Sequence, residues 1–158
     1  MALHTQPVAA RRIYPVRYER GGTAQSIANS GVRVDFNTQI FDPYSLVTTG
    51  ASWVYTCPET GYYQVSASVS FFALENWSAG FDLDTRVFIN TTQEVTLNRI
   101  RMSVAKTADR NRDVVGSALI YCSKNDTIHL KAYHQETGTR DISTGDGSYI
   151  SIHYIGAS

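Results

Sequence analysis

A strict alternation of apolar and polar residues over positions 63–71 constrains the fold of this chain more than any other feature of its sequence. The apolar positions are Tyr63, Val65, Ala67, Val69 and Phe71, and the polar ones are Gln64, Ser66, Ser68 and Ser70. A period of two residues is typical of a β-strand with one face in the core and the other in water. The same alternation recurs at 81–89, 128–133 and 149–154, and no window has the period of an amphipathic helix.

Turn-forming residues separate these segments at regular intervals, for example at Asp42-Pro43, Thr49-Gly50 and Thr137-Gly138. About ten short antiparallel strands at such spacing predict an all-β jelly-roll sandwich. The length of 158 residues suits one domain of ordinary size. We therefore predict one jelly-roll domain over residues 31–158.

The first 30 residues differ from the rest in charge and pattern. Residues 1–20 contain a single acidic residue, Glu19, and four basic ones: Arg11, Arg12, Arg17 and Arg20. This region also holds two prolines and has no helical period. We predict an extended basic arm over residues 1–30, with the four arginines binding an acidic surface of a partner. A disordered tail without a role is the alternative.

Charge and hydrophobicity exclude several classes of partner. Lys and Arg number 14 and Asp and Glu number 14, so the formal net charge is zero. Nucleic acid is not expected as a partner, because phosphate binding needs a concentrated positive field. No apolar run is long enough to span a membrane, and the N-terminal residues show no secretory signal. A chain near neutrality has little self-repulsion to oppose self-assembly.

Two cysteines, Cys57 and Cys122, each lie in an apolar, strand-like segment. They are either two buried free thiols, which the missing secretory signal favours, or a disulfide between two strands. Neither belongs to a Cys-x-x-Cys or Cys/His cluster, so we expect no zinc site.

The sequence contains no recognised catalytic motif, and we expect neither an enzyme nor a bound cofactor. His129 and His153 fall on the outward phase of their strands and are expected to be solvated. Asp82 and Asp84 share a strand face, where two carboxylates are more often solvated than bound to calcium. Trp77, in a predicted loop tip, either stacks on a sugar or closes the end of the sandwich.

Residues 34–71 carry a resemblance to a known family. The segment shows these elements in order: Phe41-Asp42, Thr49-Gly50, Tyr55-Thr56-Cys57-Pro58 and Gly61-Tyr62-Tyr63. It resembles the globular head domain of the first complement component, whose fold the tumour-necrosis-factor family shares. Two positions depart from that pattern, since Asn125 and Ile152 stand where glycines are typical. The resemblance covers about residues 31–156.

The resemblance implies a jelly roll of ten strands that associates as a homotrimer about a threefold axis. Aromatic residues make up 11% of the chain, which exceeds what one core of this size readily absorbs. Tyrosine rings suit interfaces because they combine an apolar body with a polar tip. We predict that the trimer interface contains Tyr62, Tyr63, Tyr149 and Tyr154, with Tyr149 near the axis as in the family. The alternative is that these rings cap the sandwich.

Three functions fit these observations. The first is a virion structural protein, namely a bacteriophage capsid decoration or head-fibre protein, in which a trimer binds the major capsid protein or another virion protein through its arms. The second is a receptor-binding or lectin-like head whose loops contact a glycan. The third is a secreted ligand of the complement or tumour-necrosis-factor type, which the missing secretory signal disfavours. The first predicts a location on the capsid surface and otherwise a soluble protein.

Overall fold

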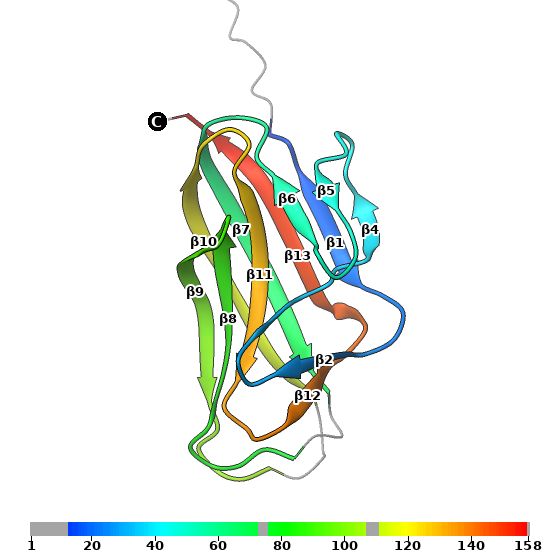
Figure 1. Cartoon of the computed structure of the whole chain (residues 1–158), viewed down its shortest axis with the longest axis vertical. Helices are drawn as coiled ribbons and strands as arrows, with labels where there is room; N and C mark the ends of the chain where they lie inside the picture. Colours follow the sequence, from blue (N-terminus) through cyan, green and yellow to red (C-terminus); the bar gives the residue numbers. More distant parts are fainter. Residues whose placement is uncertain (1–12, 73–75, 107–110, 158) are drawn as a thin grey trace, which may run out of the picture.

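The computed structural model describes residues 13–72, 76–106 and 111–157, and every regular element in these ranges is a β-strand. The strands form two antiparallel sheets packed face to face (Figure 1). Apart from the β8–β9 hairpin, the long strands from β7 to β13 cross from one sheet to the other, which is the connectivity of a jelly roll. The predicted fold class is therefore confirmed. More strands are found than the ten predicted, because several short pieces of two to four residues pair separately.

The larger sheet has seven strands in the order β2-β12-β7-β13-β1-β4, and β10 pairs with β7 beside this path. Its strands are β1 (Val16–Arg20), β2 (Gln25–Ala28), β4 (Thr38–Phe41), β7 (Gly61–Phe71), β10 (Arg112–Cys122), β12 (Thr139–Ile142) and β13 (Gly145–Gly156).

The smaller sheet has six strands in the order β5-β6-β11-β8-β9, and β3 pairs with β11. Its strands are β3 (Val32–Arg33), β5 (Val47–Thr48), β6 (Val54–Thr56), β8 (Asp82–Ile89), β9 (Thr92–Arg101) and β11 (Thr127–His134). The alternating segments of the sequence thus become β7, β8, β11 and β13.

The core lies between the sheets and is built from the inward phase of these strands. All five apolar positions of 63–71 are buried, as predicted. Aromatic rings take more of this core than the composition suggested: the core cluster includes Tyr18, Phe36, Trp53, Tyr55, Tyr63, Phe71 and Trp77. Because the core takes so many of the aromatic residues, their high number in the sequence is only weak support for an interface.

The predicted arm over residues 1–30 is wrong for the part that the structure describes. β1 is hydrogen-bonded between β13 and β4, so it is an integral strand of the larger sheet (Figure 1). Val16 and Tyr18 are buried while Arg17 and Glu19 point outward, a period-two pattern masked in the sequence by charge and proline. The sandwich domain therefore begins well before residue 31. Arg11 and Arg12 lie outside the described residues.

Arg17 and Arg20 have roles within the fold. Arg20 is buried and donates hydrogen bonds to the carbonyl oxygens of Gly21 (2.9 Å) and Thr23 (2.5 Å), which hold the turn after β1. Arg17 pairs with Glu19 at 3.2 Å and lies 4.5 Å from the ring centre of Tyr149. Arg20 is thus unavailable to the partner that the sequence predicted.

The motifs behind the family resemblance organise two loops. Asp42 is buried, and its carboxylate accepts hydrogen bonds from the backbone of Leu46 (3.0 Å) and Val47 (3.1 Å) and from the Tyr18 hydroxyl (3.1 Å). These bonds fix the β4–β5 loop against β1. Burial and the nearby Asp42 charge raise the pKa of Tyr18 to about 12.

The corner between β6 and β7 depends on Tyr63 and Gly61. The Tyr63 hydroxyl donates to the Glu59 carbonyl at 2.5 Å and accepts from the Glu59 N–H at 3.2 Å. Gly61 has φ near +150°, and a Cβ there would lie 2.4 Å from the Gly156 carbonyl oxygen. The corner therefore requires glycine at position 61.

Candidate assembly surface

The outward face of the larger sheet is the candidate functional surface, because it carries no charged residue over its centre. The register across β10, β7 and β13 aligns Val115 with Ser68 and Tyr149, Ser117 with Ser66 and Ser151, and Leu119 with Gln64 and His153. We call these nine residues, together with Tyr62 and Tyr121, the assembly face. Charges lie at its margins, on Asp113 at one end of β10 and on Arg17 and Glu19 along β1.

The β10 side of the assembly face exposes an apolar strip. The exposed fractions of Val115, Leu119 and Tyr121 are 49%, 56% and 46%. Tyr62 is exposed beside them, with its ring centre 5.3 Å from that of Tyr121. Large apolar side chains gathered on one outward face indicate a contact surface rather than a solvated one.

β10 also lacks the features that usually keep an edge strand from pairing with another chain. From Val114 to Cys122 it has no charged residue and no proline. Part of its edge is covered by β9, since Asn98 Nδ2 donates to the Val115 carbonyl at 2.7 Å and a Cβ on Gly116 would lie 2.5 Å from the Leu97 carbonyl oxygen. At Val115 and Gly116, the side chains rather than the backbone edge are thus what β10 offers to a partner.

A second apolar patch lies at the other end of the same sheet, around β4. Ile40, Phe41, Tyr44 and Ile13 are all exposed there. Tyr44 packs edge-on against Tyr14, with 5.1 Å between ring centres, and Tyr14 follows Ile13 directly. The sheet therefore carries two apolar patches near opposite edges.

The four predicted interface tyrosines divide into two pairs. Tyr62 and Tyr149 lie on the assembly face, and Tyr149 is half-buried beneath the Arg17 guanidinium. Tyr63 is wholly buried and Tyr154 packs against it with 5.3 Å between ring centres, so both belong to the chain's own interior packing. The assignment of Tyr63 to a trimer interface is wrong, because its side chain is fully buried. Tyr154 is paired with Tyr63 in the sheet and its side chain lies on the same, inward face.

Val115, Leu119 and Tyr121 were missed from the sequence, although a signal for them exists. Residues 114–122 are apolar on both phases of the strand apart from Gly116 and Ser117. A strand that is apolar on both phases is expected to be covered on both faces. In this structure the inward phase is buried by the core and the outward phase is open.

Trp77 is a core residue, so the predicted glycan contact is wrong. Its side chain is only 2% exposed and meets Phe71 edge-on, with ring centres 5.5 Å apart. The Trp77 backbone pairs with Lys106 in an isolated bridge. Trp77 therefore closes one end of the sandwich, which is the alternative that the sequence left open.

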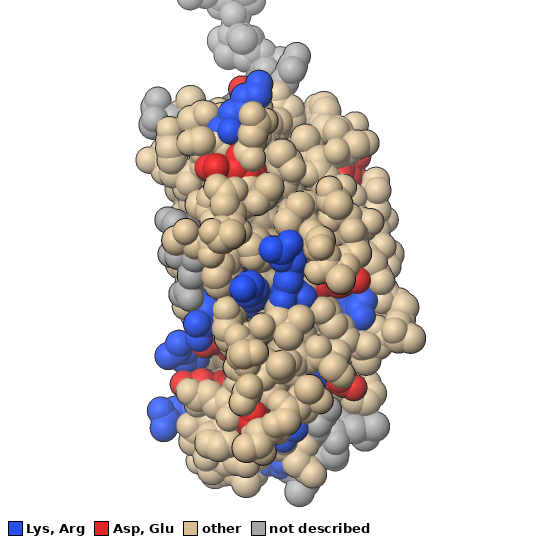
Figure 2. Space-filling model, in the orientation of Figure 1, with Lys and Arg blue, Asp and Glu red and all other residues tan. Residues whose placement is uncertain are grey.

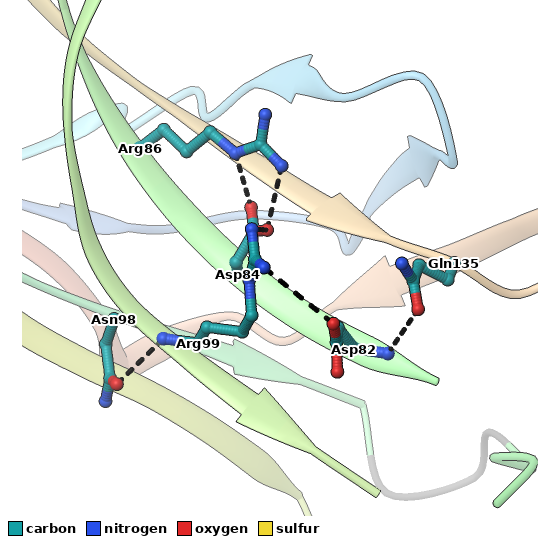
Figure 3. A network of polar contacts seen from close by, with 6 residues as sticks. All are labelled: Asp82, Asp84, Arg86, Asn98, Arg99 and Gln135. Atoms are coloured by element: carbon teal, nitrogen blue, oxygen red, sulfur yellow. Dashed lines mark hydrogen bonds and ion pairs between the residues drawn. The ribbon is translucent and has the colours of Figure 1, made fainter. Parts of the chain in front are cut away.

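Asp82 and Asp84 face cations of their own sheet (Figure 3). The buried Asp84 carboxylate accepts from Arg86 Nε and Nη2, both at 2.8 Å, and lies 3.2 Å from Arg99 Nη2. Arg99 Nη1 lies 4.0 Å from Asp82. The hydrogen bond to Asp84 raises the pKa of Arg86. Two guanidinium groups thus occupy the carboxylates that calcium would need, and no cluster of metal-ligating residues occurs among the described residues.

The two outward histidines have different environments. His153 is half-buried on the assembly face, as its phase predicts. His129 was expected to be solvated, which is wrong, because it is only 1% exposed and stacks on Phe88 with ring centres 5.2 Å apart. Burial, together with the charges of Arg33 and Lys131, lowers the pKa of His129 to about 4.

This lowered pKa predicts acid sensitivity. The unfolded chain protonates His129 near pH 6.5 and the folded chain only near pH 4, so its contribution to stability is complete above pH 6.5 and is lost as the pH falls toward 4. The loss is at most about 3 kcal/mol at about 1.4 kcal/mol per pKa unit. Denaturant unfolding at pH 7 and pH 5, at one protein concentration, should show a smaller fall for His129→Gln than for the native chain. An equal fall in both would contradict the neutral buried imidazole.

Cys57 and Cys122 are buried free thiols, as the sequence favoured. The hydrogen bond to the Cys122 thiol and burial raise the pKa of Cys57. Thiols held protonated in this way are poor nucleophiles.

Comparisons with known proteins define the fold. No family model matches the chain, and no curated protein matches it in sequence. Among solved structures, it is similar to the Eiger tumour necrosis factor of S. frugiperda, with TM-score 0.66 and 12% identity over 94% of this chain and 96% of that one. It is similar to the globular domain of zebrafish complement 1qA, with TM-score 0.61 and 13% identity over 94% of this chain and 100% of that one.

Murine APRIL is a third similar structure, with TM-score 0.60 and 14% identity over 91% of this chain and 100% of that one. The fold is thus the jelly roll of tumour necrosis factor and complement head domains, as the motifs of residues 34–71 indicated. The described residues contain no helix long and apolar enough to cross a membrane.

Proposed function

We propose that this chain is a non-enzymatic head domain that assembles as a homotrimer through the assembly face. The observation that carries the proposal is the uncharged face of β7, β10 and β13 with its exposed strip of Val115, Leu119 and Tyr121. Interfaces between copies of one chain are depleted in charge at their centre and rich in aromatic residues. The likeness to tumour necrosis factor and complement heads supports three as the number of copies.

The two apolar patches of the larger sheet supply the two different surfaces that a closed ring of copies needs. In a ring, the β10 strip of one copy packs on the β4 patch of the next, so each copy uses two different surfaces. The patches lie near opposite edges of the sheet, as this arrangement requires.

A binding function agrees with the shape of the surface. Over residues 13–72, 76–106 and 111–157 no pocket is found, whereas substrate sites are usually concave. The polar clusters described above are ion pairs and turn contacts that stabilise the fold. The protein therefore acts through the surfaces that it displays.

The virion-specific form of this function stays a prediction. It rests on an arm whose residues 1–12 lie outside the described part of the chain, while Arg17 and Arg20 belong to the sandwich. The similar structures named above give no support to a capsid partner or to a phage origin. Our proposal keeps one part of the virion hypothesis, the trimeric head. Such a head presents three equal copies of its surface, and these copies strengthen weak contacts by avidity.

Leu119→Glu tests the proposal. A carboxylate at the centre of the buried interface has no partner, so assembly should weaken by about 3 kcal/mol or more, and light scattering should show single chains of 17.5 kDa. Val104→Glu is the matched control, because Val104 is 53% exposed, follows β9 and is not part of the assembly face. Assembly should survive in Val104→Glu. A Leu119→Glu protein that keeps the native mass would show that the strip does not carry assembly.

A further inference from the structure

Three cations stand in one row on the outward face of the smaller sheet. Lys131 on β11 is directly opposite Arg86 on β8 and directly opposite Arg33 on β3. Side chains in such a row are about 5 Å apart at Cβ, and like charges placed directly opposite each other are destabilising. Figure 2 shows Lys and Arg side chains gathered in the middle of the face that this sheet presents.

The row is only partly neutralised within the chain. Arg86 is paired with Asp84, as described above. Neither Arg33 nor Lys131 forms an ion pair with a carboxylate of the described residues. An acidic residue at either position would have relieved the repulsion between like charges. A row of like charges that opposes stability and lacks a carboxylate at two of its three positions marks a candidate functional site.

The two unpaired cations are held in place by a platform of stacked rings. Phe88 and His129 stack with their planes 16° apart. Lys131 Nζ lies 4.5 Å from the ring centre of Phe88, and Arg33 Nη2 lies 3.5 Å from His129 Nε2. Because a guanidinium can only donate, the imidazole accepts through Nε2 and is neutral. Arg33 Nη1 also donates to the Ser52 carbonyl at 3.3 Å, so both cations are pre-positioned.

At the Arg86 end of the row, a carboxylate neutralises a pair of cations. There the Asp84 carboxylate lies between the guanidinium groups of Arg86 and Arg99 (Figure 3). Arg33 and Lys131 form a comparable pair of cations that lacks the carboxylate. Guanidinium groups bind carboxylates with strong, directional hydrogen bonds.

We propose that Arg33 and Lys131 form a docking site for an acidic side chain of a partner protein. The surface is open and holds no pocket among the described residues, so a small free anion would gain few contacts there. A protein segment adds contacts across the neighbouring strands and brings the carboxylate that the row lacks. The site lies on the sheet opposite the assembly face, so a trimer would display three copies of it.

The probe is a synthetic oligoglutamate peptide, titrated at low salt and neutral pH and followed by fluorescence anisotropy. We expect binding that weakens as salt is added, because the contact is between exposed charges. Arg33→Gln/Lys131→Gln should weaken binding by roughly tenfold or more, the usual effect of losing charge-assisted hydrogen bonds. Lys106→Gln/Lys124→Gln removes the same charge from two exposed positions elsewhere and should leave the affinity within about twofold.

A second readout uses the native chain, so that it does not depend on the folding of a variant. The imidazole resonances of His129 should shift on adding the peptide, because its nearest cations gain a counter-charge. Equal losses in the two double variants, or His129 resonances that do not move, would overturn the proposal. So would a heparin fragment or inorganic phosphate that binds through Arg33 and Lys131 while oligoglutamate does not.

The proposal stands apart from the assembly of the chain. The single-chain Leu119→Glu protein should still bind oligoglutamate through Arg33 and Lys131, since position 119 is on the other sheet. Loss of the trimer with retained peptide binding would separate the two surfaces. Loss of peptide binding in Leu119→Glu while the fold is intact would contradict a site contained in one copy.

Discussion

Trp77→Ala is expected to lower the free energy of unfolding by about 3–5 kcal/mol, the usual cost of removing a large buried ring. Trp77 is 2% exposed, and its edge-on contact with Phe71 closes one end of the sandwich. Denaturant unfolding of the native chain and the variant at one concentration measures the loss. The cavity should also make the end of β7 easier to open in hydrogen exchange.

Trp77→Phe is the matched control for that variant. A phenylalanine keeps an aromatic ring against Phe71 and leaves a smaller void, so we expect less than half of the alanine loss. A glycan-binding Trp77 would behave in the opposite way, with stability nearly unchanged in Trp77→Ala. Stability within about 0.5 kcal/mol of the native chain would contradict the buried position, because that is the range of surface substitutions.

Gly61→Ala is expected to have a comparable effect for a different reason. The residue has φ near +150°, and an alanine Cβ would lie 2.4 Å from the backbone oxygen of Gly156. Strained backbone and overpacking each cost about 1–3 kcal/mol, so a loss of about 2–6 kcal/mol follows. The corner should open and loosen the end of β13. Thermal and denaturant unfolding would report the change.

Gly50→Ala separates the two causes. Gly50 also has positive φ, near +94°, but nothing lies within 4 Å of a Cβ placed there. It should therefore lose only the backbone part, about 1 kcal/mol. Equal losses at positions 50 and 61 would show that the contact with Gly156 is not a constraint on the corner.

The strands that could be predicted from the sequence are those in which polar residues alternate with apolar ones. β7 shows this best, because serine and glutamine alternate with core residues along its length. β1 was missed because its outward positions are Arg17 and Glu19 and a proline precedes it, features that locally resemble a charged arm. Only its pairing with β13 and β4, distant in sequence, identifies it as a strand.

The assembly face could be predicted only in part. Tyr62 and Tyr63 were both assigned to the interface, yet adjacent residues of a strand point to opposite sides, and the alternation over 63–71 puts Tyr63 on the inward phase. Tyr62 is accordingly exposed and Tyr63 buried. The phase of His129 was predicted correctly, but its burial was not. Phe88 and Arg33, which lie on other strands, contact the His129 ring and exclude water from it. Burial on the outer face of a sheet thus depends on cross-strand neighbours that local alternation does not reveal.

The two binding surfaces proposed for this chain lie on different sheets. The larger sheet offers an uncharged, apolar face suited to copies of the same chain. The smaller sheet offers cations held on aromatic rings, suited to a different and acidic partner. Assembly through the first would multiply contacts made through the second, because three weak sites bind one extended partner more firmly than one site does.

The solution mass of the native chain, measured by light scattering with and without reducing agent, tests the trimeric head most directly. We expect the mass of three chains of 17.5 kDa each in both conditions, because the interface is non-covalent and the two cysteines are buried free thiols. A mass of one chain across the micromolar range would contradict assembly through the larger sheet and leave the smaller sheet's cation row as the only proposed binding surface.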